Sequence, residues 1–297
     1  MIQKTDIVCI GSILWDVIGR TTNHLYIGSD VPGRITRLPG GVAMNIAMTL
    51  RQYGMRPALL STIGRDPEGN ELIEEAQRMG LICDYIYRSN DLPTDVYMAI
   101  EGSNGLIAAI ADAHSLETSG DKILSAMGDG RLGTTDCPFT GLVALDGNLT
   151  EKLLQIIVKS PLFRCADLRV APASPGKAAR LSALMGHPTA TLYVNLEEAG
   201  LLCQTKFATS YDGAAGLLKR GAHRVLVTDK GNAVSEGTAE DIICHTPPSV
   251  VVARVTGAGD TFMAAHIASE AQGMTRIVAL TRAANAAATY VSGKTPL

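Results

Sequence analysis

Hydrophobic and polar positions alternate in blocks along most of this chain. Short, nearly continuous apolar runs, which are typical of buried strands, are followed by segments with apolar residues at helical spacing. Such alternation predicts a parallel sheet covered by helices on both faces. The predicted strands are 6–13, 57–63, 141–145, 192–194 and 224–227, and the predicted helices are 45–53, 68–79 and 151–159, the last with Thr150 as its N-cap.

Two polar segments interrupt this alternation. Residues 95–112 contain two strand-like runs around Gly102-Ser103-Asn104-Gly105, a sequence typical of a β-hairpin. Residues 22–39 are short-stranded and rich in Gly and Pro. We expect the two segments to pair as a small antiparallel sheet. Because no repeat or low-complexity linker divides the chain, we predict a single α/β domain, residues 1–297, with inserts at about 22–39 and 95–112.

Composition narrows the classes of protein that fit this pattern. The chain has 297 residues, 46% of them hydrophobic, and a formal net charge of −3 with scattered basic residues. We therefore expect a sizeable core and no nucleic-acid or membrane partner. The N-terminal residues lack the pattern of a signal peptide, and no apolar run approaches the length of a membrane span. Six widely spaced cysteines without a Cys-x-x-Cys pair are typical of reduced cysteines, so we expect a cytoplasmic protein.

The stretch "RVTGAGDTFMAAHIA", residues 254–268, carries the first candidate chemistry. Three small residues, Gly257, Ala258 and Gly259, precede Asp260 and a helical pattern. The first amides of a helix lack intrahelical acceptors, and a loop without side chains lets a phosphate approach them. Asp260 would repel a phosphate, so it needs another task, such as removing a proton from an attacking hydroxyl. A glycine-rich turn with Asp260 as a helix cap is the simpler alternative.

A second candidate lies near the N-terminus, in "PGGVAMNIAMTLRQYG", residues 39–54. Paired glycines, Gly40 and Gly41, precede Asn45 at the start of a predicted helix. Asp16 is expected just beyond the carboxyl end of the first strand, where ligands collect in open α/β sheets. A carboxylate, a bare backbone amide and an amide side chain could together hold the vicinal hydroxyls of a sugar. Alternatively, these residues form a turn, a helix cap and a surface acid.

Taken together, these motifs resemble the signatures of the ribokinase-like family, the PfkB carbohydrate kinases. Gly40-Gly41-x-x-x-Asn45 resembles the first family signature, and Thr256-Gly257-Ala258-Gly259-Asp260-Thr261 resembles the second. Asn195-Leu196-Glu197-Glu198 is similar to the family's Asn-x-x-Glu motif. The three motifs occur in the family's order over essentially the whole chain. The resemblance implies a ribokinase-like α/β fold, with a mostly parallel sheet, helices on both faces and a small β-sheet lid formed by the inserts.

The resemblance also implies roles for individual residues and two cofactors, ATP and Mg²⁺. It makes Asp260 the catalytic base and the amides of Gly257, Ala258 and Gly259 an anion hole. It assigns substrate binding to Asp16, Gly40, Gly41 and Asn45, with Asp112 reaching in from the lid. It assigns nucleotide handling to Asn195, Glu198, Thr228, Gly231 and Asn285, with Glu198 acting on the metal through water and Asn285 near adenine.

Within the family, several stretches resemble those of pseudouridine kinases. They are "GGVAMNIAMTLRQYG", "AAIAD" at 108–112, "DGNLTEKLL" at 146–154 and "APASPGKAARL" at 171–181. The implied reaction converts ATP and pseudouridine to pseudouridine 5′-phosphate and ADP, with Asp16 and Asn45 on the ribose 2′- and 3′-hydroxyls. The alternatives are a ribokinase-like sugar kinase, a purine nucleoside kinase, or a non-catalytic ligand-binding protein on the same fold.

Four positions depart from the patterns of these relatives. Met44 replaces an Arg, Ala113 replaces a lid Met, and Thr228-Asp229-Lys230-Gly231 replaces a Thr-Leu-Gly turn. Arg254 replaces an Asp that helps to bind a monovalent cation, so dependence on potassium is left open.

Trp15, beside Asp16, either stacks on a base or packs under the lid. Because the edge of a small lid sheet needs covering, we predict that two lids pair in a homodimer.

Overall fold

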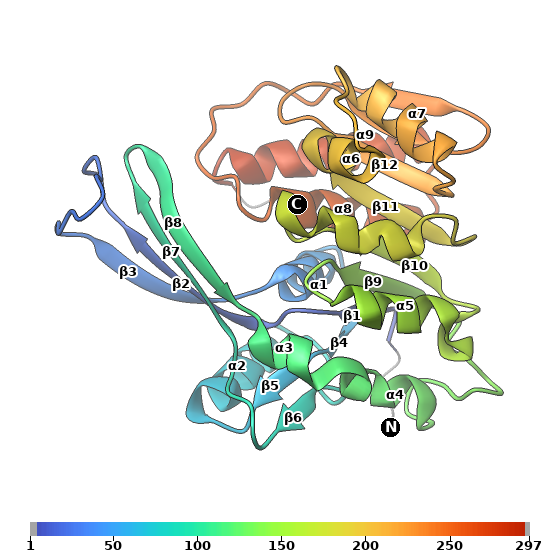
Figure 1. Ribbon diagram of the computed structural model, residues 1–297, viewed down its shortest axis with the longest axis horizontal. Helices are drawn as coiled ribbons and strands as arrows, with labels where there is room; N and C mark the ends of the chain where they lie inside the picture. The colour runs from blue at the N-terminus through green and yellow to red at the C-terminus, as the bar shows by residue number, and fades with distance from the viewer. Residues whose placement is uncertain (1–4, 295–297) are drawn as a thin grey trace.

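The main body of the protein is built around one large sheet (Figure 1). The computed structural model describes residues 5–294. Eight strands lie in the order β14-β13-β12-β11-β10-β9-β1-β4. The six strands from β12 to β4 pair in parallel, and β13 and β14 are antiparallel additions at one edge. The strands are β1 (Ile7–Ile10), β4 (Pro57–Leu60), β9 (Leu142–Asp146), β10 (Asp167–Ala171), β11 (Ala190–Asn195), β12 (Arg224–Thr228), β13 (Val234–Gly237) and β14 (Ile242–His245).

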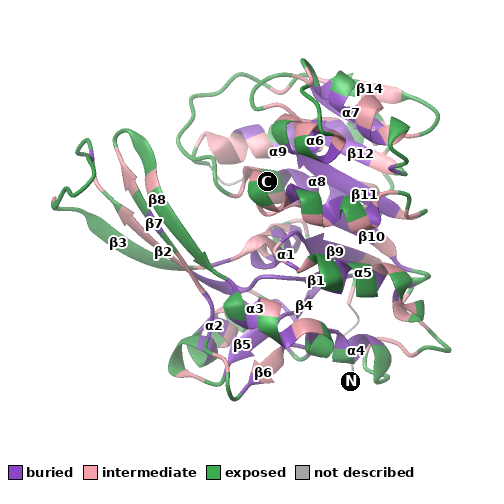
Figure 2. Ribbon diagram, in the orientation of Figure 1, coloured by how far each residue is buried: buried purple, intermediate pink, exposed green. Residues whose placement is uncertain are grey.

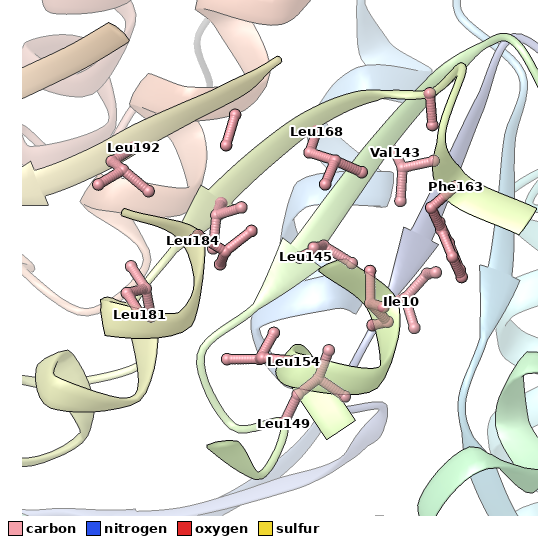
Figure 3. Close-up of a cluster of buried hydrophobic side chains, with 14 of the residues drawn as sticks. Ile10, Val143, Leu145, Leu149, Leu154, Phe163, Leu168, Leu181, Leu184 and Leu192 are labelled. Carbon is pink, nitrogen blue, oxygen red and sulfur yellow. The ribbon is translucent and has the colours of Figure 1, made fainter. Parts of the chain in front are cut away.

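Helices cover both faces of this sheet because the strands are apolar on both sides. Successive residues of a strand point to opposite faces, so Ile7 and Cys9 of β1 belong to one buried cluster, and Val8 and Ile10 belong to the other. Figure 3 shows part of the second cluster, with Ile10, Val143 and Leu145 packed together. The strands that carry these residues are buried in Figure 2.

Two of the helices begin at clear capping residues. Asp66 accepts a hydrogen bond from the amide of Gly69 and precedes Pro67 at the first position of α2, and Thr150 caps α5 through the amide of Leu153. The helices are α1 (Val42–Gln52), α2 (Pro67–Arg78), α3 (His114–Ser119), α4 (Ser125–Gly128), α5 (Glu151–Lys159), α6 (Leu196–Cys203), α7 (Ser210–Lys219), α8 (Ala258–Ala271) and α9 (Arg276–Val291), and the 3₁₀ helices are η1 (Gly120–Leu124), η2 (Pro161–Phe163) and η3 (Pro175–Leu184). The predicted cap and bounds of α5 are confirmed.

A second sheet projects from one side of the body (Figure 1). Its strand order is β3-β2-β7-β8, and the strands are β2 (Leu14–Arg20), β3 (Arg34–Gly40), β7 (Val96–Gly102) and β8 (Gly105–Asp112). The predicted hairpin of the second insert is present as β7 and β8. A large, mostly parallel, helix-covered sheet with a separate small sheet was predicted, and this fold class is confirmed. We refer to the four-stranded sheet as the lid sheet.

The composition of the lid sheet differs from the prediction in one respect. The two inserts do not pair with each other, because β2 lies between β3 and β7. Since β2 pairs with β7 in parallel and with β3 antiparallel, the lid sheet is mixed. The predicted strand 6–13 is also too long, because β1 ends at Ile10 and β2 begins at Leu14. The break falls at Gly11, where any Cβ would collide with the side chain of Asp146.

Another predicted strand is divided as well. The run 57–63 becomes β4 and a short strand β5 (Thr62–Gly64), which pairs with β6 (Tyr87–Ser89) in a two-stranded sheet. No helix in the described part of the chain is long and apolar enough to cross a membrane.

Candidate active site

The candidate site lies at the edge of the large sheet where its parallel strands end. Asp146 ends β9, and Asn195 and Thr228 end the neighbouring strands β11 and β12, on which they are register partners. The first turns of α1 and α8 meet here, because Asn45 of α1 donates a hydrogen bond from Nδ2 to Oδ2 of Asp260 at 2.9 Å. The structure therefore joins the two predicted signatures, which are far apart in the sequence, by a direct contact.

The N-terminus of α8 is open. Gly257 is its N-cap, with a φ of 87°, and no side chain caps the helix. A Cβ on Gly257 would lie 2.6 Å from the hydroxyl of Tyr290, so only glycine fits this turn. The amide of Ala258 donates to the carbonyl of Val255 at 3.1 Å. The amides of Gly257, Gly259 and Asp260 have no hydrogen-bond partner within residues 5–294, so these three, and not that of Ala258, are the donors free to receive an anion.

The carboxyl group of Asp260 has the properties of a base that works near neutral pH. Its pKa is raised to about 7, chiefly by burial and further by the nearby carboxylates of Asp146 and Asp16, while the hydrogen bond from Asn45 lowers it. A base is most effective when its pKa lies close to the working pH. Burial among other carboxylates thus gives Asp260 the strength that a solvent-exposed aspartate lacks.

Asp16 and the paired glycines adjoin Asp260. Asp16 lies in the lid strand β2, not just beyond the end of β1 as predicted, because the chain turns at Gly11 and forms a new strand. Gly40 lies in β3, which pairs with β2. A Cβ on Gly40 would overlap the Asp16 carboxylate, so β3 must have glycine at this position. Burial raises the pKa of Asp16 to about 6. The carboxylate is thus partly desolvated and needs a hydrogen-bond donor to satisfy it.

The N-terminus of α1 is closed by a residue from another segment. Gly41, with a φ of 95°, is the N-cap and supplies no side chain. Instead, Ser12 accepts a hydrogen bond from the amide of Val42 through Oγ at 2.9 Å and one from the amide of Met44 through its carbonyl at 3.4 Å. Ser12 therefore satisfies two of the first amides of α1 from thirty residues away.

Sequence reasoning missed the group that holds Ser12. Asp146 is fully buried and accepts hydrogen bonds from the amides of Ser12 and Asn148, each at 2.7 Å, and also from the Ser12 hydroxyl. Burial raises the pKa of Asp146. The signal was present as Asp-Gly-Asn directly after a buried strand, opposite the small residues Gly11 and Ser12 after the neighbouring one.

Four of the five predicted nucleotide residues, Asn195, Glu198, Thr228 and Gly231, lie at or just after the ends of β11 and β12, at the same edge of the sheet. Asn195 and Glu198 form a capping box on α6, in which each side chain accepts a hydrogen bond from the backbone amide of the other. Burial, and to a smaller extent the charge of Glu197, raises the pKa of Glu198 to about 7. Thr228 is half-buried at the end of β12, whereas Gly231 in the following turn and Asn285 on α9 are exposed. No cluster of three His, Cys, Asp or Glu side chains suited to a metal occurs in the described residues.

Two predicted residues near the lid are placed by local contacts. Asp112 ends β8, is exposed, and accepts a hydrogen bond from the amide of His114; the structure shows no contact of Asp112 with Asp16, Asn45 or Asp260. Trp15 is 4% exposed and donates from its indole nitrogen to the carbonyl of Glu68, so of the two alternatives it packs under the lid.

Arg254 anchors the loop that leads into α8. Its guanidinium donates to the carbonyls of Tyr290 at 2.9 Å and Lys294 at 3.0 Å, at the C-terminal end of α9, and lies 3.7 Å from the centre of the Tyr290 ring. The Tyr290 hydroxyl in turn donates to the carbonyl of Thr256. A positive charge at the negative end of a helix dipole is favourable, so this contact fixes the loop before Gly257.

The helix-covered sheet, its lid and a carboxylate beside an open helix N-terminus define a ribokinase-like phosphotransferase. The family model described as "pfkB family carbohydrate kinase" matches residues 4–296, so the chain belongs to the PfkB family of carbohydrate kinases. The recognition made from the sequence is thereby confirmed. Its members are phosphotransferases that act on hydroxyl groups, and this chain is a sugar or nucleoside kinase of that family.

Individual relatives agree with this assignment. "Uncharacterized sugar kinase YeiI" of Escherichia coli (strain K12) is 29% identical over 90% of this chain and 72% of its own length. "Pseudouridine kinase" of the same organism is 27% identical over 92% of this chain and 86% of its own. The solved structure of Arabidopsis thaliana ribokinase complexed with ribose and ATP superposes with a TM-score of 0.79, covering 97% of this chain and 92% of that chain, at 21% identity. At this identity the superposition establishes the fold alone.

Proposed function

We propose that this kinase transfers the γ-phosphoryl group of ATP to the 5′-hydroxyl of pseudouridine, giving pseudouridine 5′-phosphate and ADP. The observation that carries the kinase half is the contact of Asn45 with Asp260 beside the open N-terminus of α8. The pseudouridine half rests on the sequence stretches that resemble pseudouridine kinases and on the similarity to the Escherichia coli enzyme of that name.

Asp16 and Asn45 are proposed to hold the ribose 2′- and 3′-hydroxyls, with Gly40 and Gly41 leaving room for the sugar. Asp16 is partly desolvated, and a hydroxyl donor on the acceptor would satisfy it. Met44, which departs from the Arg of pseudouridine kinases, is fully buried in the core beneath α1. The departure therefore changes the packing of α1 and does not place an apolar group among the sugar contacts. Asp112 is left out of this proposal because it caps the backbone at His114.

The residues at the nucleotide end fit a bound ATP and Mg²⁺. The free amides of Gly257, Gly259 and Asp260 suit the phosphate chain, and Gly259 has open space on its Cβ side. Asn195 and Glu198 would act on the metal through water, while Thr228, Gly231 and Asn285 would line the nucleoside part. ATP supplies the phosphoryl group, and Mg²⁺ neutralises charge on its oxygens.

In the proposed step, Asp260 accepts the proton of the attacking 5′-hydroxyl. The raised pKa of Asp260, about 7, makes it a stronger base than an ordinary aspartate while leaving a useful fraction ionised at neutral pH. Asn45 donates to Oδ2 and so holds the carboxyl group in one orientation. The amides of α8 stabilise the charge that develops on the transferred group.

The lid sheet is proposed to cover the acceptor and to pair with a second lid in a homodimer. Its edge strands β3 and β8 are mostly exposed, and both carry large apolar side chains, including Ile35, Leu38, Leu106 and Ile110. Exposed edges with apolar residues need a partner. Light scattering that showed a monomer at micromolar concentration would contradict the dimer. The cytoplasmic location and the absence of nucleic-acid partners stay predictions.

Arg254 is proposed to make a monovalent cation unnecessary. Its guanidinium already donates hydrogen bonds to two carbonyl groups at the end of α9, next to the loop that leads to the anion-binding turn. A permanently charged side chain in this place leaves no need for potassium to hold the loop.

A phosphorylation screen tests the function. ADP release from Mg²⁺-ATP is measured with pseudouridine, uridine, cytidine, adenosine, inosine, ribose and fructose, and the Asp260→Asn variant, purified in the same way, controls for contaminating kinases. We expect the highest kcat/KM with pseudouridine, and a loss of about 1–3 kcal/mol of binding with its 2′-deoxy analogue because Asp16 is left unsatisfied.

The outcomes separate the alternatives. If ribose or adenosine is used more efficiently than pseudouridine, the kinase stands but the acceptor assignment fails. If no acceptor releases ADP above the Asp260→Asn control, the non-catalytic ligand-binding alternative is favoured.

A further inference from the structure

Two stretches of sequence that phosphoryl transfer alone does not explain lie in contact beside the active site. One is Asp146-Gly147-Asn148 at the end of β9, and the other is the first turns of η3. Lys177 of η3 donates a hydrogen bond from Nζ to Oδ1 of Asn148 at 2.5 Å, and Arg180 donates to the backbone carbonyl of Asn148 at 2.7 Å. The side-chain oxygen and the backbone carbonyl of Asn148 are therefore both bound by cationic side chains of one helix.

The contact with Lys177 determines which way the Asn148 amide faces. An asparagine side chain has an oxygen that only accepts and a nitrogen that only donates. With Oδ1 bound to the ammonium group, Nδ2 faces the opposite side, where it lies 3.1 Å from Ser12 Oγ and 3.2 Å from Asp146 Oδ2. A reversed amide would place two donors against each other at Lys177 and an oxygen against the buried carboxylate of Asp146.

The same contacts continue to the catalytic centre. Ser12 is bound by both Asp146 and Asn148, and it closes the N-terminus of α1 through the amides of Val42 and Met44. The next residue of α1, Asn45, donates to Asp260. Each neighbouring pair in this series is joined by a direct hydrogen bond. A change in the orientation of the Asn148 amide would therefore alter the hydrogen bonds of Ser12, and with them the first turn of α1.

We propose that Lys177 is a positioning residue: it orients Asn148 and, through Asp146 and Ser12, fixes the first turn of α1 so that Asn45 meets Asp260. The proposal rests on the kinase function proposed above, and it assigns no contact with substrate to Lys177. It explains why a lysine of η3, a segment that carries none of the predicted site residues, is half-buried beside the end of β9. We call the series Lys177, Asn148, Asp146 and Ser12 the positioning relay.

A double-mutant cycle in the full-length protein tests the kinetic side. Lys177→Met and Asn148→Ala are each expected to lower kcat/KM for the acceptor that the native protein uses best by about 10- to 100-fold, the effect of losing a hydrogen bond to a charged group. The KM for ATP should not change. Because both variants break the same relay, the double variant should be no worse than Asn148→Ala alone. Lys177→Arg, which keeps a cationic donor, should recover part of the activity.

The matched control is Lys152→Met. Lys152 is an exposed lysine on the first turn of α5, outside the positioning relay, so its loss should leave both kinetic terms unchanged. Two results would overturn the proposal. The first is a double variant whose loss of kcat/KM equals the product of the losses in the two single variants. The second is a rise in KM for ATP with unchanged acceptor kinetics, which would make Lys177 a nucleotide-binding residue.

Amide hydrogen exchange provides a readout that needs no substrate. The amides of Val42 and Met44 are bound to Ser12, so they should exchange faster in Lys177→Met and in Asn148→Ala than in the native protein or Lys152→Met. Unchanged exchange at these positions would overturn the proposal. If the native protein phosphorylates no acceptor in the screen, the proposed function fails, and the exchange result alone then decides whether the relay positions α1.

Discussion

The N-termini of α1 and α8 meet at one site, yet their first amides are used in opposite ways. In α1 the amides of Val42 and Met44 are bound to Ser12. In α8 the amides of Gly259 and Asp260 have no protein partner within the described residues. The two helices are joined by the hydrogen bond from Asn45 to Asp260. The first amides of α1 are therefore satisfied within the fold, whereas those of α8 are free to bind a ligand.

Local sequence does not explain this difference. Both helices have a glycine N-cap with a positive φ, 95° at Gly41 and 87° at Gly257, and neither glycine can cap the helix with a side chain. What closes α1 is a serine thirty residues upstream, itself held by Asp146. A closed end can hold a side chain such as Asn45 in place, whereas an open end can stabilise a developing negative charge. The proposed mechanism uses one of each.

Replacing Asp260 should produce the largest effect. Asp260→Asn keeps the size of the side chain and a partner for Asn45 but removes the proposed base, so we expect turnover to fall by about 10² to 10⁴. ATP binding, measured by calorimetry, should stay close to normal because the free amides of α8 remain. Near-normal turnover would exclude Asp260 as the base.

Closing the open helix end should rank second. Gly259→Pro removes the amide hydrogen at the second helical position, where proline is tolerated, and should lower kcat by about 10² to 10³, as for loss of one oxyanion-hole donor. Gly259→Ala keeps the amide and meets open space, so its loss should be much smaller. Equal losses in the two variants would show that the small size of Gly259 matters and its amide does not.

Opening the closed helix end should come next. Ser12→Ala leaves the amide of Val42 and the carboxylate of Asp146 each without one partner, and should lower the free energy of unfolding by about 1–3 kcal/mol in urea titrations. Thr150→Ala removes the cap of α5 outside the site and should cost about 1 kcal/mol. Only Ser12→Ala should also lower kcat/KM for the acceptor. An equal kinetic effect of the two variants would refute a special role for the α1 cap.

The parts of the molecule that could be predicted from sequence are those with contiguous signals. Five strands of the large sheet, β1, β4, β9, β11 and β12, are continuous apolar runs, and Gly257 to Asp260 lie side by side in the chain, so these were found, whereas β10, β13 and β14 were not predicted. The lid strand β2 was missed because its residues extend the apolar run of β1, and only the close approach of Asp146 at Gly11 separates the two. Ser12 and Asp146 are 134 residues apart, and no periodicity links them.

The pH dependence of activity should report the surroundings of Asp260. Because the ionised form of Asp260 is the proposed base and its pKa is about 7, kcat/KM should rise as the pH increases through neutrality. The hydrogen bond from Asn45 lowers this pKa and the charge of Asp16 raises it. The rising limb should therefore move to higher pH in Asn45→Ala and to lower pH in Asp16→Asn, whatever the absolute rates. Shifts in the same direction would contradict this account.

The smallest effect concerns the anchor of the open helix end. Arg254 binds the carbonyls of Tyr290 and Lys294 and so holds the loop before Gly257 with a charge of its own. Replacing potassium chloride by tetramethylammonium chloride at equal ionic strength should then leave kcat/KM unchanged. Arg254→Gln should lower it by less than about tenfold, because Arg254 is exposed and solvent can replace its hydrogen bonds, so that together they are worth only ~1 kcal/mol. If the native protein instead requires potassium, the metal ion and not this guanidinium holds the loop. The conformation of the N-terminus of α8 would then depend on a bound ion.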